Sequence, residues 1–477
     1  MTHIWPTIVG IRADVLYGFG LLLAIAVTLH VLLRKREVAS AVGWIGLVWF
    51  APIVGAGLYA VLGVNRVQRR ARRLRPQERG TGQPERRHGR LGPDEDDHLA
   101  ALARGIGRIT ARPLLDANAM TVLHDGDQAY PAMLEAIGQA QRCIGMSSYI
   151  FRDDAWGGRF IEALAAAHGR GVAVRVLIDG VGGGWLMSPA YRHLVRAGVP
   201  AQRFLHEVLP WRMPFLNLRS HKKVLVVDGA IGFTGGVNIS AQNVLAEQPK
   251  DPVQDTHVRI TGPLVRQLTE AFAQDWWFAA DEELDTAIWC PEVRDQGHTP
   301  ARVIDSGPDE DLEKIEFAVL QAVACARERI MVMTPYFLPD ERLIAALAMA
   351  AMRGVAVDVV IPEVSDHPTV EWAMRANMGP LLRDGVRVWR SPPPFRHSKV
   401  MVVDGEWVLL GSCNWDNRSF RLNFELCVEV YDAGLAGTLT TLVQANMQHP
   451  LTEAELDARS LPVRLRDAAA RLAMPYL

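Results

Sequence analysis

One pattern of polar residues occurs twice in this chain of 477 residues. Each copy has a histidine, a lysine two residues later, an aspartate seven residues after the histidine and an asparagine seventeen residues after it. The members are His221, Lys223, Asp228 and Asn238 in the first copy and His397, Lys399, Asp404 and Asn414 in the second. Matched spacing at four positions indicates that the chain contains one fold twice, with the same polar side chains on each half.

Both copies predict a strand that enters a hairpin. A valine-rich run, VLVV or VMVV, follows each lysine and leads into an Asp-Gly turn. Residues two apart in a strand share a face, so the histidine and the lysine of each copy point the same way. An ammonium group and an amide suit a phosphate-like anion. Histidine is the side chain best suited to act as a nucleophile or proton carrier near neutral pH.

Each part of the pattern also has a purely structural interpretation. A single His-x-Lys strand usually indicates only a solvated face, and an aspartate before glycine is ordinary turn chemistry. The repetition favours a catalytic role for the histidines and lysines of both copies. Asp228 and Asp404 are included as catalytic candidates, with turn formation as their alternative.

The duplication extends beyond this pattern. Residues 160–179 align with residues 343–362 at 12 of 20 positions. Each segment predicts an amphipathic helix, an Arg-Gly break and an apolar strand, and a further strand precedes it, ending at Phe151 or Phe337. Each half is thus predicted to run strand, helix, strand, loop and hairpin. Two such halves would form a pseudo-twofold α/β/α sandwich, with a shared site where both histidines converge.

The paired segments resemble those of the phospholipase D superfamily, and in detail those of the bacterial cardiolipin synthases. The second copy continues as GSCNWDNRSFRLNFELCVEVYD over residues 411–432, which is similar to the family's GS.N.D.RS...NFE run. Further blocks that match are YIFRDD, LIDGVG, DTHVRI, SGPDED and TPYFLPD. The resemblance covers roughly residues 110 to 440. It departs at Gly236, where the second copy has Ser412, so the small hydroxyl contact is expected at Ser412 and not in the first site, whose histidine and lysine are intact.

The resemblance implies transfer of a phosphatidyl group in two steps. One histidine attacks the phosphorus of phosphatidylglycerol while the other protonates the departing glycerol. The second histidine then deprotonates a head-group hydroxyl of another lipid, which yields cardiolipin. Family similarity favours His221 as the nucleophile and His397 as the acid and base, although the near-equivalent halves leave this assignment open. The expected phosphate-binding groups are Lys223, Lys399, Asn238, Asn414 and Ser412. No metal or other cofactor is expected.

Both imidazoles need an orienting carboxylate, because a hydrogen bond to one ring nitrogen fixes which nitrogen can attack. Asp255 in QDTHVRIT and Glu425 in NFELCVEV align by their strand context, and the family pattern implies an acid at this place. We expect these two residues to orient the histidines. The alternative is that they are surface acids on edge strands.

Two apolar segments near the N-terminus predict a membrane anchor. Residues 15–33 have His30 as their only strongly polar member, and residues 38–64 contain no charged residue. Each is long enough to cross a hydrocarbon core of about 30 Å. A cleaved signal peptide is the alternative, but an early basic region and an A-x-A site are missing, and a second apolar segment follows. We therefore expect a transmembrane helical hairpin.

Arginines after the second apolar segment predict the orientation of this hairpin. Ten arginines lie between residues 66 and 90, against three basic residues between the two segments. The positive-inside rule places the catalytic part in the bacterial cytoplasm and the hairpin in the inner membrane, although the basic residues between the segments act in the opposite sense. Residues 66–98 have almost no apolar content and predict a flexible linker.

Composition bounds the remaining organisation. The predicted parts are an anchor at 1–65, a linker at 66–98 and two phospholipase D-like domains at 99–297 and 298–477. A net charge of −2 gives no general attraction to nucleic acid, and five cysteines without a CxxC spacing indicate a reducing compartment. The mixed aromatic and basic stretch at 206–220 fits either contact with a bilayer or an ordinary packed connection.

Three functions fit these features. The first is cardiolipin synthesis from phosphatidylglycerol at a membrane bilayer, with phosphatidylethanolamine as the alternative second lipid. The second is a hydrolytic phospholipase D or another head-group transferase, which would use the same residues. The third is a membrane scaffold without activity, which two intact sets of histidine and lysine argue against. The oligomeric state stays open, because the duplication already supplies both halves of a site.

Overall fold

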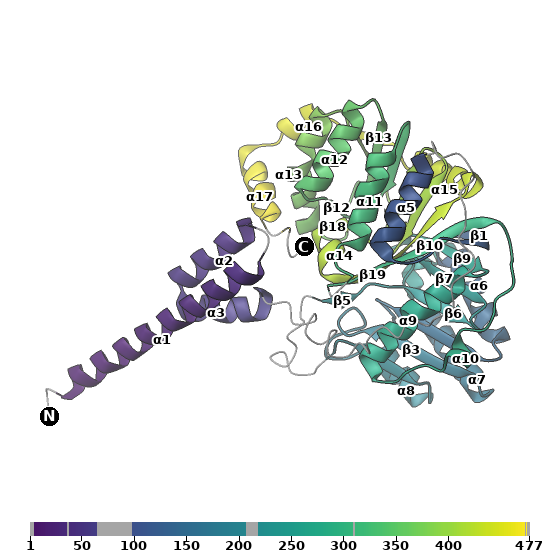
Figure 1. The fold of residues 1–477 in the computed structure, drawn as a ribbon, viewed down its shortest axis with the longest axis horizontal. Helices are drawn as coiled ribbons and strands as arrows, with labels where there is room; N and C mark the ends of the chain where they lie inside the picture. The colour runs from purple at the N-terminus through teal and green to yellow at the C-terminus, as the bar shows by residue number, and fades with distance from the viewer. Residues whose placement is uncertain are drawn as a thin grey trace. The chain divides into compact units, whose positions relative to one another are not determined.

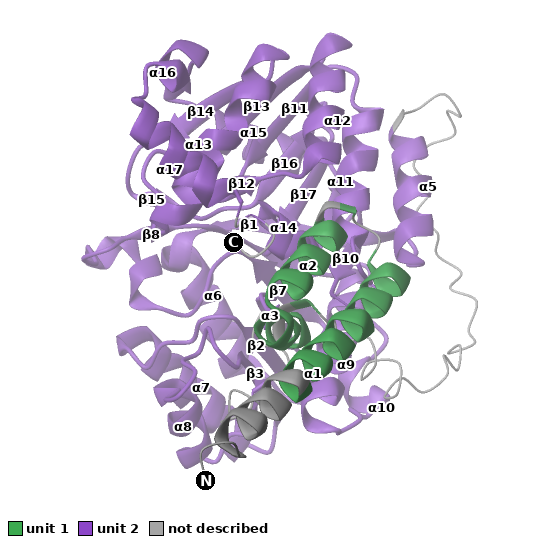
Figure 2. Cartoon of the chain, turned by 90° about the vertical axis from the view of Figure 1, so that its left-hand side faces the viewer, with its two compact units in different colours: residues 1–73, 209–217 green, residues 74–208, 218–477 purple. Residues whose placement is uncertain are grey.

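The structure is a computed structural model that describes residues 4–35, 38–63, 98–206, 218–308, 311–472 and 474. It contains two compact units: residues 1–73 together with 209–217, and residues 74–208 together with 218–477 (Figure 2). The predicted linker lies outside the described residues apart from His98, as do residues 207–217 of the aromatic and basic stretch.

The described part of the first unit is a helical hairpin. Its elements are α1 (Ile4–Arg34), α2 (Val38–Phe50), α3 (Pro52–Leu58) and the π-helix η1 (Tyr59–Gly63). Trp49 Nε1 donates to Thr28 Oγ1 at 3.1 Å, and His30 Nδ1 lies 2.7 Å from the Tyr59 hydroxyl. These contacts tie both parts of the second arm to α1.

The second arm is not the single helix predicted for residues 38–64. Helix α2 ends at Phe50, α3 begins at Pro52, and Ala51 between them has φ −137° and ψ 77°. The cause is Pro52, which has no N–H to donate and disfavours helical conformation in the residue before it. Among the described helices, only the Val15–Arg34 part of α1 has the length and apolar composition to cross a membrane.

One sheet of 16 strands runs through the second unit, 15 of them side by side in one order and the sixteenth, β5 (Arg219–Ser220), beside that order. From its centre outward the first half contributes β1 (Leu115–His124), β9 (Thr256–Thr261), β7 (Ile231–Gly235), β6 (Val224–Val227), β2 (Cys143–Ser148), β3 (Ala173–Asp179) and β4 (Ala201–Phe204). In the same order the second half contributes β10 (Thr299–Ser306), β19 (Asn423–Tyr431), β17 (Trp407–Gly411), β16 (Val400–Val403), β11 (Arg329–Met333), β13 (Ala356–Pro362) and β14 (Arg387–Ser391), with β20 (His449–Leu451) at the outer edge. Strands β1 and β10 pair antiparallel at the centre. The predicted duplicated α/β fold with pseudo-twofold symmetry is therefore confirmed.

Helices cover both faces of the sheet (Figure 1). In the first half these are α6 (Asp125–Gln139), α7 (Ala155–Gly169) and α8 (Pro189–Arg196) on one face and α9 (Leu264–Ala280) on the other. Their counterparts are α11 (Lys314–Cys325), α12 (Glu341–Met352), α13 (Pro368–Arg383) and α15 (Ala433–Ala445). The alternation along β2 shows the two layers: Ile144 and Met146 enter the core under α6 and α7, whereas a side chain at Gly145 would meet Phe272 of α9.

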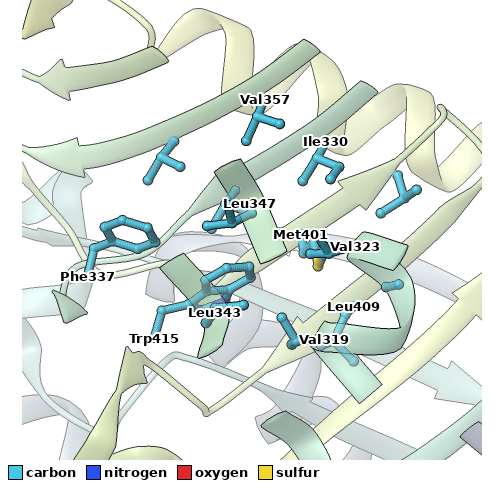
Figure 3. Packing of buried hydrophobic residues seen from close by; sticks show 14 of the residues in the cluster. Val319, Val323, Ile330, Phe337, Leu343, Leu347, Val357, Met401, Leu409 and Trp415 are labelled. Atoms are coloured by element: carbon cyan, nitrogen blue, oxygen red, sulfur yellow. The ribbon is translucent and has the colours of Figure 1, made fainter. Parts of the chain in front are cut away.

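The core of the second half lies between its sheet and helices α11 to α13. Ile330 and Val357 on adjacent strands pack with Leu347 of α12 (Figure 3). The ring centroids of Phe337 and Trp415 lie 5.9 Å apart in the same cluster. Burial of side chains of this size stabilises the fold by roughly 1.5–3 kcal/mol each, so this core holds the second histidine-bearing hairpin in place.

The helix that precedes the first half packs in the second. Helix α5 (His98–Thr110) places Leu102 and Ile106, both fully buried, in the core with α11. Arg302 of β10 donates to the carbonyl oxygen of Ala103 in α5 at 2.9 Å. The two halves are thereby joined into one compact unit.

The sequence prediction omitted two strands and three helices in each half. In the first half these are β1, α6, α8, β4 and α9, and in the second they are β10, α11, α13, β14 and α15. The helix and strand predicted in each half are confirmed as α7 with β3 and α12 with β13. The strands predicted to end at Phe151 and Phe337 end earlier, at Ser148 and Met333. The second unit also contains α17 (Leu461–Arg471) and the short elements α10 (Thr286–Trp289), η3 (Ala241–Asn243), η4 (Leu245–Glu247), β12 (Phe337–Leu338), β18 (Trp415–Asp416), α14 (Asn417–Arg421) and α16 (Glu453–Asp457).

Candidate active site

A short strand precedes each histidine and pairs with the opposite half of the molecule. Strand β5 (Arg219–Ser220) pairs with the start of β19, and β15 (Phe395–Arg396) pairs with β8 (Val253–Gln254). The backbone N–H of His221 then donates to the Phe424 carbonyl at 2.8 Å, and that of His397 to the Gln254 carbonyl at 2.7 Å. The residue after each of these carbonyls is an acid, so each histidine lies beside the acid of the other half.

His221 is held in one tautomer by two acceptors. Its Nδ1 lies 2.9 Å from the Ser412 carbonyl oxygen and 3.1 Å from Glu425 Oε2. A carbonyl can only accept, so Nδ1 carries the hydrogen whatever the protonation state of Glu425. The Nε2 atom of the neutral ring is consequently left with its lone pair, which is the requirement for a nucleophile.

His397 has the corresponding arrangement with a single carboxylate. Its Nδ1 lies 2.6 Å from Asp255 Oδ2, and Lys399 Nζ lies 2.8 Å from the same nitrogen. An ionised carboxylate only accepts, so we assign the Nδ1 hydrogen to the bond with Asp255. Lys399 then donates to the His397 carbonyl oxygen, as Lys223 does to the His221 carbonyl at 2.8 Å.

Burial and a concentration of cations set the charges of the site. Burial, together with Lys223 and Lys399, lowers the pKa of His221 well below its ordinary value. Burial and Lys399 lower the pKa of Lys223 to about 7, and burial lowers that of Lys399 to about 8. The positive charges in this site repel one another, so each makes the charged form of the others less favourable. A bound phosphodiester anion would stabilise all of these charged forms.

The two orienting acids differ in charge. Burial raises the pKa of Asp255, but Lys399 and His397 outweigh it and lower that pKa to about 2. Burial raises the pKa of Glu425 to about 7. His397 therefore faces a fixed anion that favours its imidazolium form, while burial and Lys399 act more strongly and lower the pKa of this ring. His221 faces a carboxyl group that is partly protonated at neutral pH.

The difference between Gly236 and Ser412 follows from the lengths of these two acids. The Ser412 hydroxyl donates to Glu425 Oε2 at 2.6 Å. A Cβ atom at Gly236 would lie 2.1 Å from Asp255 Oδ1, because the shorter acid already fills that space. The first half thus combines glycine with aspartate, and the second combines serine with glutamate.

The two asparagines differ in their surroundings, and Asn238 lines a cavity together with His397. Asn238 Oδ1 accepts from the Ile150 N–H at 3.1 Å. This bond uses the amide oxygen and leaves the amide nitrogen as the donor on the opposite side of the group. Asn414 is buried, and its Oδ1 has no partner among the residues that the structure describes. Tyr149 was missed by the sequence prediction: its ring lies 4.8 Å from that of His221 and 5.3 Å from Lys223 Nζ. The YIFRDD block was the available signal.

Asp228 and Asp404 are bound to loop backbone. Asp228 accepts from the N–H groups of Gln141, Arg142 and Cys143 at 2.7–3.0 Å. Asp404 accepts from those of residues 327, 328 and 329 at 2.8–2.9 Å. Both have positive φ, 54° and 51°, which aspartate tolerates in a turn. Each lies at the end of its strand that is distant from the lysine, and we propose that each fixes its hairpin to the preceding loop.

Replacing Asp228 with alanine is expected to lower the free energy of unfolding by roughly 1.5–3 kcal/mol, because three N–H groups lose their acceptor. The turnover of the folded fraction should stay close to that of the wild type. Asp228→Asn, which tolerates the same φ, is the matched variant and should be less destabilised. Thermal unfolding and activity on the same samples test this. A large loss of turnover with unchanged unfolding would place Asp228 in the chemistry instead.

A cavity of about 540 Å³ opens beside His397. It is lined by both halves, with Asn238, Ser240 and Arg152 from the first and Asp366 from the second. His221 is not among the lining residues. The cavity therefore approaches the site from the side of His397.

Comparison with known proteins finds similarity to cardiolipin synthases in both the family model and the full-length relatives. A family model described as "Cardiolipin synthase, PLD-like domain" matches residues 133–276 and 319–448, one segment in each half. Cardiolipin synthase A of Pseudomonas aeruginosa is 33% identical over 95% of this chain and 94% of its own. Cardiolipin synthase 2 of Staphylococcus epidermidis is 30% identical over 97% of this chain and 98% of its own. The crystal structure of phosphatidylserine synthase from Haemophilus influenzae shares the fold, with a TM-score of 0.60 at 15% identity, over 79% of this chain and all of that one.

Proposed function

The chain belongs to the cardiolipin synthase family of phospholipase D-like proteins, and from this premise we propose that it is a phosphatidyltransferase that makes cardiolipin from two molecules of phosphatidylglycerol. The observation that carries the proposal is the crossed pairing of two buried histidines with two acids, His221 with Glu425 and His397 with Asp255. In each ring Nδ1 is hydrogen-bonded, no residue that the structure describes bonds to Nε2, and a lysine lies beside the ring.

In the first step His221 attacks the phosphorus of phosphatidylglycerol. A bond forms between phosphorus and His221 Nε2, and the bond between phosphorus and the glycerol oxygen breaks. His397, as imidazolium, donates its Nε2 proton to that oxygen, so free glycerol leaves. The product on the enzyme is a phosphatidyl-histidine.

In the second step the hydroxyl of another phosphatidylglycerol attacks the same phosphorus. Its proton passes to His397, an oxygen–phosphorus bond forms, and the bond from phosphorus to His221 breaks. The product is cardiolipin, and both histidines return to their starting states.

The assignment of roles is supported by the different surroundings of the two rings. The Ser412 carbonyl keeps His221 in the tautomer that can attack. Burial and the neighbouring lysines lower the pKa of both rings, and they lower that of His221 well below its ordinary value, which keeps this ring neutral. Asp255, which is ionised, suits a ring that must alternate between neutral and cationic forms. These features favour His221 as nucleophile and His397 as acid and base.

The lysines and asparagines of the two sets would hold the oxygens of the five-coordinate phosphorus. Lys223 and Lys399 are buried, so their charges act with little screening by water. Preorganised donors of this kind, together with Asn238 and Asn414, supply several kcal/mol of transition-state stabilisation. Ser412 contributes by fixing Glu425.

The relatives and the apolar part of α1 indicate that the protein associates with a membrane. We propose that residues 1–65 anchor it in the bacterial inner membrane through both arms of the hairpin. The ten arginines between residues 66 and 90 favour a cytoplasmic position for the two catalytic halves, residues 99–297 and 298–477.

Hydrolysis of phosphatidylglycerol by the same residues is the second candidate, because water can replace the second lipid. Liposomes of phosphatidylglycerol labelled in both the glycerol and the phosphate distinguish the two. The expected products are labelled cardiolipin and free glycerol in equal amounts. Phosphatidic acid as the main product would overturn the transferase proposal. Adding labelled phosphatidylethanolamine tests the alternative second lipid.

A further inference from the structure

The cavity beside His397 contains two cations that the chemistry above does not use. Arg152 follows β2, and Lys250 lies in the loop before β8. Both are exposed, and neither has an ion pair within the part of the chain that the structure describes. Resting on the proposed transfer reaction, we infer that this cavity binds the head group of the acceptor lipid and that Arg152 and Lys250 bind the acceptor's own phosphodiester.

The acceptor differs from water in carrying a second anion. When the hydroxyl of phosphatidylglycerol attacks, its own phosphate is three carbons away and enters the site with it. The buried lysines Lys223 and Lys399 already donate to the histidine carbonyl oxygens. In the proposed reaction they also bind the oxygens of the phosphate that is transferred. A transferase therefore needs further cations near the attacking hydroxyl, whereas a hydrolase needs none.

The position of the cavity agrees with this requirement. It reaches His397, which takes the proton of the attacking hydroxyl, and Asn238 of the transferred-phosphate site. A volume of about 540 Å³ is ample for a glycerophosphate group. Within it, the hydroxyl oxygen bonds to phosphorus as the bond from phosphorus to His221 Nε2 breaks, and the proton goes to His397.

Besides the two cations, the acids Asp251 and Asp366 line the cavity, and the backbone at Arg152 is fixed. The Arg152 N–H donates to the Ile239 carbonyl at 2.9 Å, which fixes the backbone from which its guanidinium extends. Across the cavity Asp366 accepts from the Tyr336 hydroxyl at 2.8 Å. A carboxylate so placed can accept from the hydroxyls of a glycerol group, while the cations take its phosphate.

The test replaces both cations, as Arg152→Gln with Lys250→Gln, in the full chain reconstituted in phosphatidylglycerol liposomes. Arg196→Gln, an exposed arginine on α8, is the matched control. Two acceptors are compared: phosphatidylglycerol, through cardiolipin formation, and free labelled glycerol, through its exchange into phosphatidylglycerol. Glycerol carries no phosphate, so its exchange reports the phosphatidyl-histidine without the proposed site.

Cardiolipin formation by the double variant is expected to fall roughly ten- to a hundredfold, while glycerol exchange stays near wild type. The share of phosphatidic acid should rise, because water then competes better for the intermediate. Unchanged cardiolipin formation would overturn the inference, as would an equal loss of both reactions. The transferase proposal itself is tested separately, by the products of the wild-type protein. If the wild type yields only phosphatidic acid, that proposal fails whatever the variants do.

Discussion

Replacing His221 with alanine is expected to abolish the covalent phosphatidyl-enzyme and to reduce cardiolipin formation to background, a loss of roughly 10⁶-fold. The ring is the only group in our proposal that bonds to phosphorus, and its Nε2 is prepared by the Ser412 carbonyl and Glu425. The measurement is retention of labelled lipid on the denatured protein after brief exposure to phosphatidylglycerol. Thermal unfolding of the variant shows whether the fold is intact.

His397→Ala is the matched variant, and its defect should be of another kind. Loss of a general acid costs roughly 10²–10⁴-fold, and the loss depends on how poor the leaving group is. With a phosphatidyl ester of nitrophenol, which leaves without a proton, His397→Ala should still form the labelled enzyme, whereas His221→Ala should not. The reverse result would exchange the two roles. Label on both variants would show that neither histidine alone is required as the nucleophile.

The sequence alone predicted the duplicated fold and most of the residues that lie in the candidate active site. Offsets within each copy predicted that histidine, lysine and asparagine recur, and the matched helix and strand segments predicted equal halves. The pairing of each histidine with the acid of the other half could not be predicted in this way. It depends on two short strand pairings, β5 with β19 and β15 with β8, which join residues about 140 to 200 positions apart.

Other features also depended on tertiary contacts. The sequence showed that Gly236 replaces the serine of the second copy, but only the position of Asp255 explains why a side chain is excluded there. Helix α5 precedes the first half and completes the core of the second, which no local pattern signals. Pro52, by contrast, is a helix breaker that the sequence shows directly. The prediction of one continuous span over residues 38–64 considered their apolar content and not this proline.

The crossed acids are expected to differ in importance. Asp255→Asn should reduce cardiolipin formation roughly 10³–10⁴-fold, because the carboxamide can donate to Nδ1 of His397 and stabilise the wrong tautomer. Glu425→Gln should cost only about tenfold, because the Ser412 carbonyl still holds the hydrogen on Nδ1 of His221. The measurement is the steady-state rate of cardiolipin formation by each variant in the same liposomes. Equal losses would contradict the role assigned to the Ser412 carbonyl.

Glu425→Gln also has a signature in stability that a catalytic effect would not produce. Folding raises the pKa of Glu425 from 4.5 to about 7, so the folded protein holds a proton that the unfolded chain releases between these values. The contribution of this group to stability is complete below about pH 4.5 and is lost as the pH rises through 7. Glutamine removes this loss, so the unfolding free energy of the variant should rise relative to wild type from pH 5 to pH 8. Glu316, whose pKa burial raises to about 7, does not interact with Glu425 and cancels in the difference. Burial and the charge of Glu425 raise the pKa of Asp416 to about 6, so removing that charge stabilises ionised Asp416 and acts in the same direction. A difference independent of pH would show that Glu425 is already ionised beside His221, and the partial neutrality that distinguishes the two histidines would then be wrong.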